Sequence, residues 1–413
     1  MTVAAPIDDS TAAEPGLLAL AKRNALVLSA AQAVVGAAAP VAISTGGLTG
    51  AYLLAADKSL ATAPVAGYNI GVALGAVPAA LLMRAVGRRL GFMGGASITA
   101  TGGLIAAVAV YVGSFWLFAA GLLVTGFASS FAQQYRFAAT DHAPADFKPR
   151  AIAWVLAGGL FAALLGYAIV AWLREIMAPI SFMGVFMGIV GLGLAGVLIT
   201  SLLRVPSGES PTKADTSGPP ARPLGAIVRQ PAYLVALLCS ITGYALMSFV
   251  MTGAPLAMVA CGFAVETAAF AIMLHVMAMF GPSFFTGRLI VLFGATRIIL
   301  TGMALLVVCA AFGLAGIDLV NFWGALIALG VGWNFAFIGA TALLTETYHP
   351  SERGKAQGFH DLAMFSSVAF ASLMSGATFN AHGWDMLNWI ILPATLACSL
   401  VLLGVRRGTP AAA

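Results

Sequence analysis

Four side chains that can bind soft metal ions lie close together near the middle of the chain. Met247 and Met251 are four residues apart, and so are His275 and Met279. Residues four apart share one face of a helix. Thioether sulfur and imidazole nitrogen prefer Cu(I) to hard cations such as Mg²⁺ or Ca²⁺. The spacing therefore predicts a soft-cation site. The alternative is that the methionines fill gaps between helices and the histidine bonds a neighbouring helix.

The composition indicates a membrane protein. Of 413 residues, 61% are hydrophobic and 8% are charged, and the mean hydropathy is +0.98. A soluble domain has about 25% charged residues. The net charge of +5 is not gathered in a basic domain, which excludes nucleic-acid binding. Asp8, Asp9 and Glu14 do not suit a cleavable signal peptide, so we expect the first apolar helix to stay in the mature protein.

Apolar runs of about 20 residues, long enough to cross a bilayer core of about 30 Å, recur along the chain. They predict twelve spanning helices near 24–44, 62–84, 91–112, 115–138, 151–173, 180–203, 232–258, 264–287, 296–315, 319–343, 356–379 and 385–405. With the N-terminus inside, all Lys and Arg except Lys58 and Arg174 fall in inner segments. This asymmetry supports both the span number and the orientation.

A hydrophilic stretch rich in Pro, Gly and Ser divides the spans into six plus six. We therefore predict an N-terminal six-helix half, a cytoplasmic linker and a C-terminal half that carries the Met/His site, with both tails cytoplasmic. The predicted bounds are 1–23 for the N-terminal tail, 24–204, 205–230, 231–405, and 406–413 for the C-terminal tail.

The two halves carry similar inner loops. TDHAPADFKPRAIAW follows the fourth run from Thr140, and TETYHPSERGKAQGF follows the tenth from Thr345. The loop RAVGRRLGF from Arg84 is similar to the signature of the major facilitator superfamily, although Arg84 stands where an acid is expected, and GRLIVLFGATR from Gly287 is its counterpart. The chain resembles that superfamily over its whole length. The resemblance implies an all-α membrane fold with a binding site between the halves, near the midplane.

The Met/His pairs fall on the seventh and eighth predicted helices at similar depth. Met247 lies about 22 Å along one helix from its inner end, and His275 about 16 Å along the next from its outer end. Both motifs resemble the paired motifs of the CcoA-like copper importers, a branch of the superfamily. This resemblance implies copper import, as Cu(I), through Met247, Met251, His275 and Met279, to supply the assembly of a haem–copper cytochrome c oxidase. A sister branch is similar to riboflavin transporters.

Other residues could pass copper on from the Met/His site, or could belong to a site for an organic substrate. Thiols and further thioethers or imidazoles that could pass copper on are Cys239, Cys261, Met183, Met187, His360 and Met364. Polar side chains within spans could instead line a cavity for an organic molecule, or join helices: Gln32, Asn69, Gln133, Gln134 and Asn334. If Met247 and His275 face lipid, a carrier of a small organic molecule is favoured over a copper transporter. Tryptophans, Trp333 among them, are expected mostly at the membrane interfaces.

The sequence thus predicts a copper importer of the bacterial cytoplasmic (inner) membrane. It is expected to be a monomer without a prosthetic group, with copper ions, the lipid bilayer and copper chaperones as partners. The alternative is a carrier of a small organic molecule such as riboflavin or a drug. A membrane enzyme or a receptor is disfavoured, because no nucleophile–base pair, cysteine cluster or large soluble loop stands out.

Overall fold

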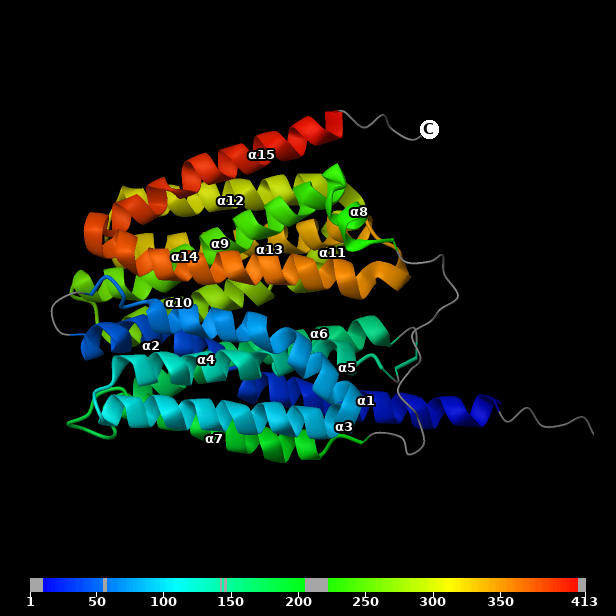
Figure 1. Cartoon of the computed structure of the whole chain (residues 1–413), viewed down its shortest axis with the longest axis horizontal. Coiled ribbons are helices and arrows are strands. Elements are labelled where there is room, and N and C mark those ends of the chain that lie inside the picture. Colours follow the sequence, from blue (N-terminus) through cyan, green and yellow to red (C-terminus); the bar gives the residue numbers. More distant parts are fainter. Residues whose placement is uncertain (1–9, 55–57, 142, 145–146, 205–221, 408–413) are drawn as a thin grey trace, which may run out of the picture.

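The computed structural model describes residues 10–54, 58–141, 143–144, 147–204 and 222–407, and in these residues the chain is helical throughout (Figure 1). The elements are α1 (Ser10–Val35), α2 (Ala38–Leu53), α3 (Ala63–Tyr111), α4 (Phe115–Ala132), α5 (Tyr135–Ala138), α6 (Lys148–Leu173), α7 (Met183–Ser201), α8 (Leu224–Val228), α9 (Pro231–Ala260), α10 (Val265–Phe280), α11 (Ser283–Phe293), α12 (Ala295–Ala315), α13 (Leu319–Thr345), η1 (Pro350–Glu352), α14 (Arg353–Trp389) and α15 (Ile391–Arg407).

The helices match the predicted apolar runs. Within the described residues, 10 helices are long and apolar enough to span a membrane, and the bent pair α10 and α11 raises the number to 11. A shorter apolar helix, Ile391–Gly404, coincides with the twelfth run. A helix bonds all its backbone groups internally, which lipid requires. Large apolar side chains such as Val291, Trp172 and Leu198 are exposed on the outside, where lipid can solvate them.

The first span is longer than the predicted run 24–44, because α2 continues to Leu53. Gly46, Gly50 and their Ser and Thr neighbours lower the hydropathy there, yet they are buried. An added Cβ at Gly50 would clash with the carbonyl oxygen of Ala61. These small residues therefore serve close packing of helix against loop rather than exposure to water.

The same span is interrupted between α1 and α2. Pro40 cannot donate a backbone hydrogen bond to the carbonyl of Gly36, so the helical ladder breaks at this point. Both Gly36 and Pro40 line the central cavity described below. The break therefore lies next to the space in which a ligand would bind.

Two inner loops singled out in the sequence share one backbone feature. Gly87, which separates the two spans within α3, has φ +82°, and Gly294, between α11 and α12, also has φ +82°. This left-handed conformation favours glycine. The equal conformation at corresponding positions supports an internal repeat of the two halves.

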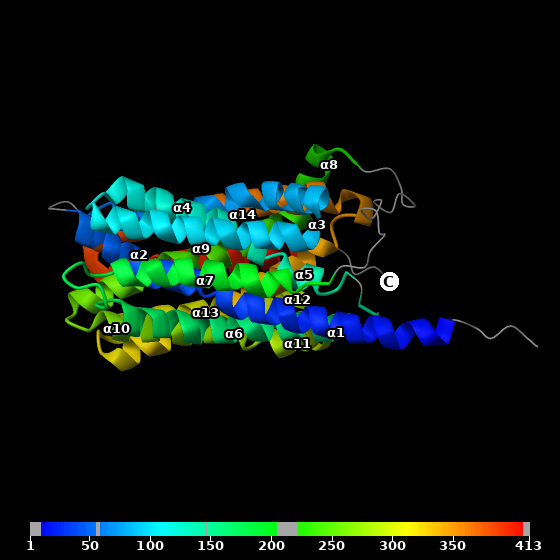
Figure 2. The ribbon, with the colours of Figure 1, turned by 90° about the horizontal axis from the view of Figure 1, so that it is seen from below.

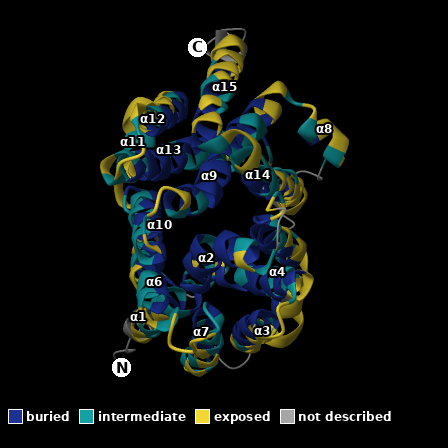
Figure 3. Ribbon diagram, turned by 90° about the vertical axis from the view of Figure 1, so that its left-hand side faces the viewer, coloured by how far each residue is buried: buried dark blue, intermediate teal, exposed yellow. Residues whose placement is uncertain are grey.

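The helices form two groups that pack side by side. In Figure 3, α1–α4, α6 and α7 lie below and α9 and α11–α15 above, and the buried residues face inward. The groups meet where α14 packs on α3 and α10 packs on α6. α8, the first residues of α1 and the end of α15 lie at the same end of the bundle (Figures 1 and 2). The predicted division into domains stays a prediction, and residues 205–221 of the predicted linker lie outside the described residues.

An ion pair joins Arg222, just before α8, to Glu352 between α13 and α14. Arg222 donates from Nε to Glu352 Oε1 at 2.7 Å and from Nη2 to Oε2 at 2.7 Å, while the Glu352 side chain is fully buried. Glu352 also accepts from the backbone N–H of His349 at 3.0 Å. These bonds, above all those from Arg222, hold the pKa of Glu352 well below its usual range. They attach the segment before α8 to the α13–α14 loop.

We expect Glu352→Gln to lower the melting temperature of the purified protein in detergent. Because the folded-state pKa of Glu352 is depressed, its carboxylate stabilises the fold above the unfolded pKa, and this contribution is lost only as pH falls through the folded pKa. The loss in melting temperature should therefore be constant between about pH 5 and 8. Arg222→Gln should give a similar loss, and the double variant little more. An additive loss in the double variant would contradict the pairing.

Candidate functional site

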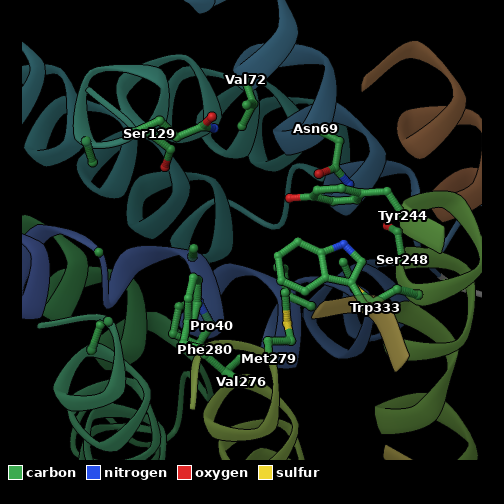
Figure 4. Close-up of a pocket in the computed structure, with 18 of the residues that line it drawn as sticks. Pro40, Asn69, Val72, Ser129, Tyr244, Ser248, Val276, Met279, Phe280 and Trp333 are labelled. Carbon is green, nitrogen blue, oxygen red and sulfur yellow. The ribbon is translucent and has the colours of Figure 1, made fainter. Parts of the chain in front are cut away.

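A cavity of about 290 Å³ lies between the two groups of helices (Figure 4). Its walls come from α1–α6 in one group and from α9, α10, α13 and α14 in the other. This volume is at the lower end of the range of small-molecule sites. The position matches the expected site between two halves.

One wall of the cavity is aromatic. Trp333 and Phe337, four residues apart on α13, stack with ring centroids 5.2 Å apart and an interplanar angle of 13°. The Tyr244 ring stands nearly perpendicular to both, at 5.3 Å from each, and Phe365 and Phe280 extend the wall. Such a wall presents flat and edge-on aromatic surfaces to a ligand.

Polar side chains from several helices also line the cavity. They are Gln32, Tyr68, Asn69, Ser129, Gln133 and Ser248. The hydroxyls of Tyr68 and Ser129 are 2.7 Å apart. Asn69 Nδ2 donates to Ser372 Oγ at 2.8 Å, and the hydroxyls of Ser372 and Ser248 are 2.7 Å apart. A mainly apolar cavity with a few oriented polar groups is typical of an organic-ligand site.

Two opposite charges lie among the lining residues of the cavity. Arg136 comes from α5 and Asp361 from α14, so each group of helices supplies one. Asp361 Oδ1 also lies 2.9 Å from His360 Nδ1, and His360 itself is buried. Among the residues that line the cavity, Arg136 and Asp361 carry formal charges, and no histidine is present. The formal charges of these lining residues therefore cancel.

Polar contacts join the two groups toward the outer side. The hydroxyl of Thr62, at the start of α3, donates to the carbonyl of Leu373 at 3.2 Å and accepts from the backbone N–H of Gly376 at 3.1 Å. Arg174 lies 3.1 Å from Glu266, likewise at the outer ends of α6 and α10. The outer side is therefore closed. The cavity extends toward the inner side, where Arg136 and Asp361 lie.

Three of the four predicted metal ligands line the cavity, and the fourth does not. Met247, Met251 and Met279 are in its wall. His275 is fully buried, and its Nδ1 donates to the carbonyl oxygen of Leu326 on α13 at 2.8 Å. The histidine thus joins α10 to α13, as the packing alternative proposed. Within the described residues, no group of three or more His, Cys, Asp or Glu could hold a metal ion. Metal binding by the methionines stays an untested prediction.

The residues predicted as a relay are scattered. Met364 lines the cavity, whereas Met183 and Met187 on α7 do not, although they pack against the core cluster that contains Met364. Cys261 is exposed at the end of α9. Cys239 is buried with its sulfur 3.7 Å from that of Cys398 on α15, and neither thiol lines the cavity.

The polar residues that could line a cavity for an organic molecule have two different roles in the structure. Gln32, Asn69 and Gln133 line the cavity. Asn334 instead joins helices: its Nδ2 donates to the carbonyl of Met279 at 2.6 Å and its Oδ1 accepts from Thr286 at 2.6 Å. From the sequence, an orientation of Met247 and His275 toward lipid would favour the organic alternative. Both side chains are instead buried.

The aromatic wall was missed in the sequence. Trp333 was expected at an interface, but it is 6% exposed and stands inside the cavity. The available signal was the four-residue spacing of Trp333 and Phe337, which places both rings on one face of a single helix. Tyr244, three residues before Met247 on α9, gave no comparable signal.

Known proteins similar to this chain are transporters. It is 45% identical to the riboflavin transporter RfnT of Brucella anthropi over 396 residues, which covers 95% of this chain and 98% of that protein. It is 28% identical to YddS of Bacillus subtilis, an uncharacterized transporter of the major facilitator type, over 382 residues, covering 89% and 87% of the two chains.

The similarity to a riboflavin transporter over nearly the whole length corrects the prediction of copper import. Copper ions and copper chaperones as partners, and a role in cytochrome c oxidase assembly, are corrected with it. The physical reason for the error lies in the motif: methionines at spacing four line an aromatic cavity, and His275 uses its ring nitrogen to join two helices. The organic-substrate alternative fits better.

Solved structures share the fold. The xylose transporter XylE of E. coli, in a partially occluded inward-open conformation, superposes with a TM-score of 0.70 at 14% identity, covering 94% of this chain and 98% of that one. The nucleoside transporter NupG gives a TM-score of 0.64 at 14% identity, covering 93% and 98%. The Major Facilitator Superfamily pattern matches residues 24–337 and 282–413. The chain is a multi-pass protein of the bacterial inner membrane and belongs to the Major Facilitator Superfamily.

Proposed function

We propose that this protein carries riboflavin, or a flavin with the same ring system, across the cytoplasmic membrane. The observation that carries the proposal is the 45% identity to a riboflavin transporter over 95% of the chain. We expect it to act as a carrier, because the relative that it matches over nearly its whole length is a transporter.

The cavity has the chemistry that a flavin needs. The isoalloxazine ring of a flavin is flat and aromatic, and the parallel pair Trp333 and Phe337 offers a surface on which such a ring can stack. The ring edge and the ribityl chain carry carbonyls, an imide N–H and hydroxyls. Gln32, Asn69 and Gln133 can donate to or accept from such groups.

The charges of the lining favour an uncharged substrate. Arg136 and Asp361 cancel, so the cavity supplies no excess positive charge for a phosphate. Riboflavin is neutral at pH 7, whereas its phosphorylated forms are anions. A buried anion without a partner is strongly unfavourable. We therefore expect selection of the free vitamin over its phosphate.

Uptake of radioactive riboflavin tests the proposal in a bacterial strain that can neither make nor import the vitamin. Expression of the chain should restore growth on low riboflavin and saturable uptake. A large excess of unlabelled riboflavin should abolish uptake of the label, and the same excess of riboflavin phosphate should leave most of it.

The control is Asp361→Asn, which leaves Arg136 unbalanced in the lining and should make riboflavin phosphate a better competitor. In the same cells, radioactive copper should not accumulate above the empty-vector level. Failure of the expressed, membrane-inserted protein to transport any riboflavin would overturn the proposal. Copper accumulation without riboflavin uptake would overturn it as well.

A further inference from the structure

A chain of three hydrogen-bonded side chains crosses from one group of helices to the other at the cavity wall. Asn69 belongs to α3, Ser372 to α14 and Ser248 to α9. Asn69 Nδ2 donates to Ser372 Oγ at 2.8 Å, and Ser372 Oγ lies 2.7 Å from Ser248 Oγ. Asn69 and Ser248 line the cavity, whereas Ser372 is fully buried behind them.

The Asn69 amide has one orientation in this structure, with Nδ2 toward Ser372. A carboxamide has one acceptor oxygen and one donor nitrogen on opposite sides. Because Ser372 takes a hydrogen from Nδ2, the oxygen Oδ1 is left for the cavity side, as the close-up shows (Figure 4). In the described residues Oδ1 has no hydrogen-bond partner. Asn69 therefore presents a fixed acceptor to any ligand.

This acceptor lies beside the aromatic wall. Figure 4 shows the Asn69 amide next to the ring of Tyr244, with Trp333 on the other side of that ring. Asn69 and Trp333 thus lie on opposite sides of the Tyr244 ring, and both line the same cavity, so one ligand can contact both. The polar edge of a flavin has a single N–H, the imide between two carbonyls, and an amide oxygen matches that donor and not the carbonyls.

We propose that Ser372 is a positioning residue for substrate recognition: it holds the Asn69 amide so that Oδ1 accepts the imide N–H of a flavin. This inference rests on the proposed function. Ser372 does not touch the ligand. Its effect on recognition passes through Asn69.

The positioning bond depends on the closure of the outer side. Asn69 is seven residues, or about 10 Å, further along α3 than Thr62, whose bonds to α14 close that side. Alternating access separates the two halves there in the outward-facing state. Because the Asn69–Ser372 bond also joins α3 to α14, we expect this separation to break it and to confine recognition of the imide to the state in which the outer side is closed.

The test compares uptake of riboflavin with uptake of its N3-methyl derivative, which lacks the imide hydrogen. We expect the unmodified protein to prefer riboflavin by about 3- to 10-fold in uptake at low concentration, the range of one neutral hydrogen bond. Asn69→Ala should reduce this preference to near one by raising the KM for riboflavin alone. Ser372→Ala should do the same, although its side chain is outside the cavity.

Ser375→Ala is the matched control. Ser375 is one turn away on the same helix, is equally buried, and bonds to α9 through the carbonyl of Phe249 at 2.6 Å. It should keep the full preference. If the Ser372→Ala variant transports neither compound, its preference can be measured by binding instead. Quenching of flavin fluorescence by the purified variant gives the ratio of its affinities for riboflavin and the N3-methyl derivative.

The outcomes separate the two proposals. Absence of riboflavin uptake by the unmodified protein would overturn the proposed function. Riboflavin uptake without a preference, or a preference that survives in Ser372→Ala or in Asn69→Ala, would overturn the role of Ser372 and leave the function standing. Loss of the preference in Ser375→Ala as well would assign the effect to general loosening of α14 and would also overturn the positioning role.

Discussion

Replacement of Trp333 by alanine is expected to lower riboflavin uptake at low concentration by about 5- to 150-fold, almost entirely through KM. The Trp333 ring is parallel to Phe337 and is the largest side chain of the aromatic wall. Stacking of one flat heterocycle on an aromatic side chain contributes about 1–3 kcal/mol. Each 1.4 kcal/mol corresponds to a factor of ten in affinity. Radioactive riboflavin uptake at matched expression measures the change.

Two further variants show whether stacking is the cause. Trp333→Phe keeps an aromatic face and should retain most of the uptake. Trp172→Ala removes a tryptophan that is 78% exposed on the outside of the bundle, and it should leave KM unchanged. Equal uptake by Trp333→Ala and the unmodified protein would show that the ligand binds elsewhere in the cavity.

The membrane topology could be predicted from the sequence because it depends on properties that add up along a segment. Hydropathy over about 20 residues and the distribution of Lys and Arg are such sums, and errors at single residues average out. The first span shows the limit: Gly46 and Gly50 reduce the hydropathy of α2, but they are buried. Their role is close contact, which depends on a partner that the segment itself does not reveal.

The site could not be predicted in the same way, because it depends on which face of each helix meets the cavity. Met247 lines the cavity, whereas its predicted partner His275 donates to a carbonyl of α13 and is not among the lining residues. Both residues belong to four-residue pairs, so spacing alone could not distinguish them. Trp333 shows the reverse error, since tryptophan is common at interfaces and this one is inside.

Gly376→Ala is expected to reduce riboflavin transport by about tenfold or more while leaving binding to the purified protein within a few-fold. Gly376 packs against Thr62 where the outer side closes, and an added Cβ would clash with Thr62 Oγ1 and lie 2.8 Å from its Cγ2. Threonine is β-branched and cannot easily rotate away. Overpacking of this kind is unfavourable by about 1–3 kcal/mol. The clash acts only when the outer side is closed, so it favours the outward-facing state.

Gly358→Ala is the control, since Gly358 is exposed on the same helix and an added Cβ there meets no atom within 4 Å. Thr62→Gly should restore part of the transport of Gly376→Ala, because it removes the atoms that clash. Gly376→Ala should also lose preference for riboflavin over the N3-methyl derivative, since the Asn69–Ser372 bond requires the same closure. Normal transport by Gly376→Ala would show that the contact is not needed to close the outer side. Transport lost with the preference kept would separate closure from recognition.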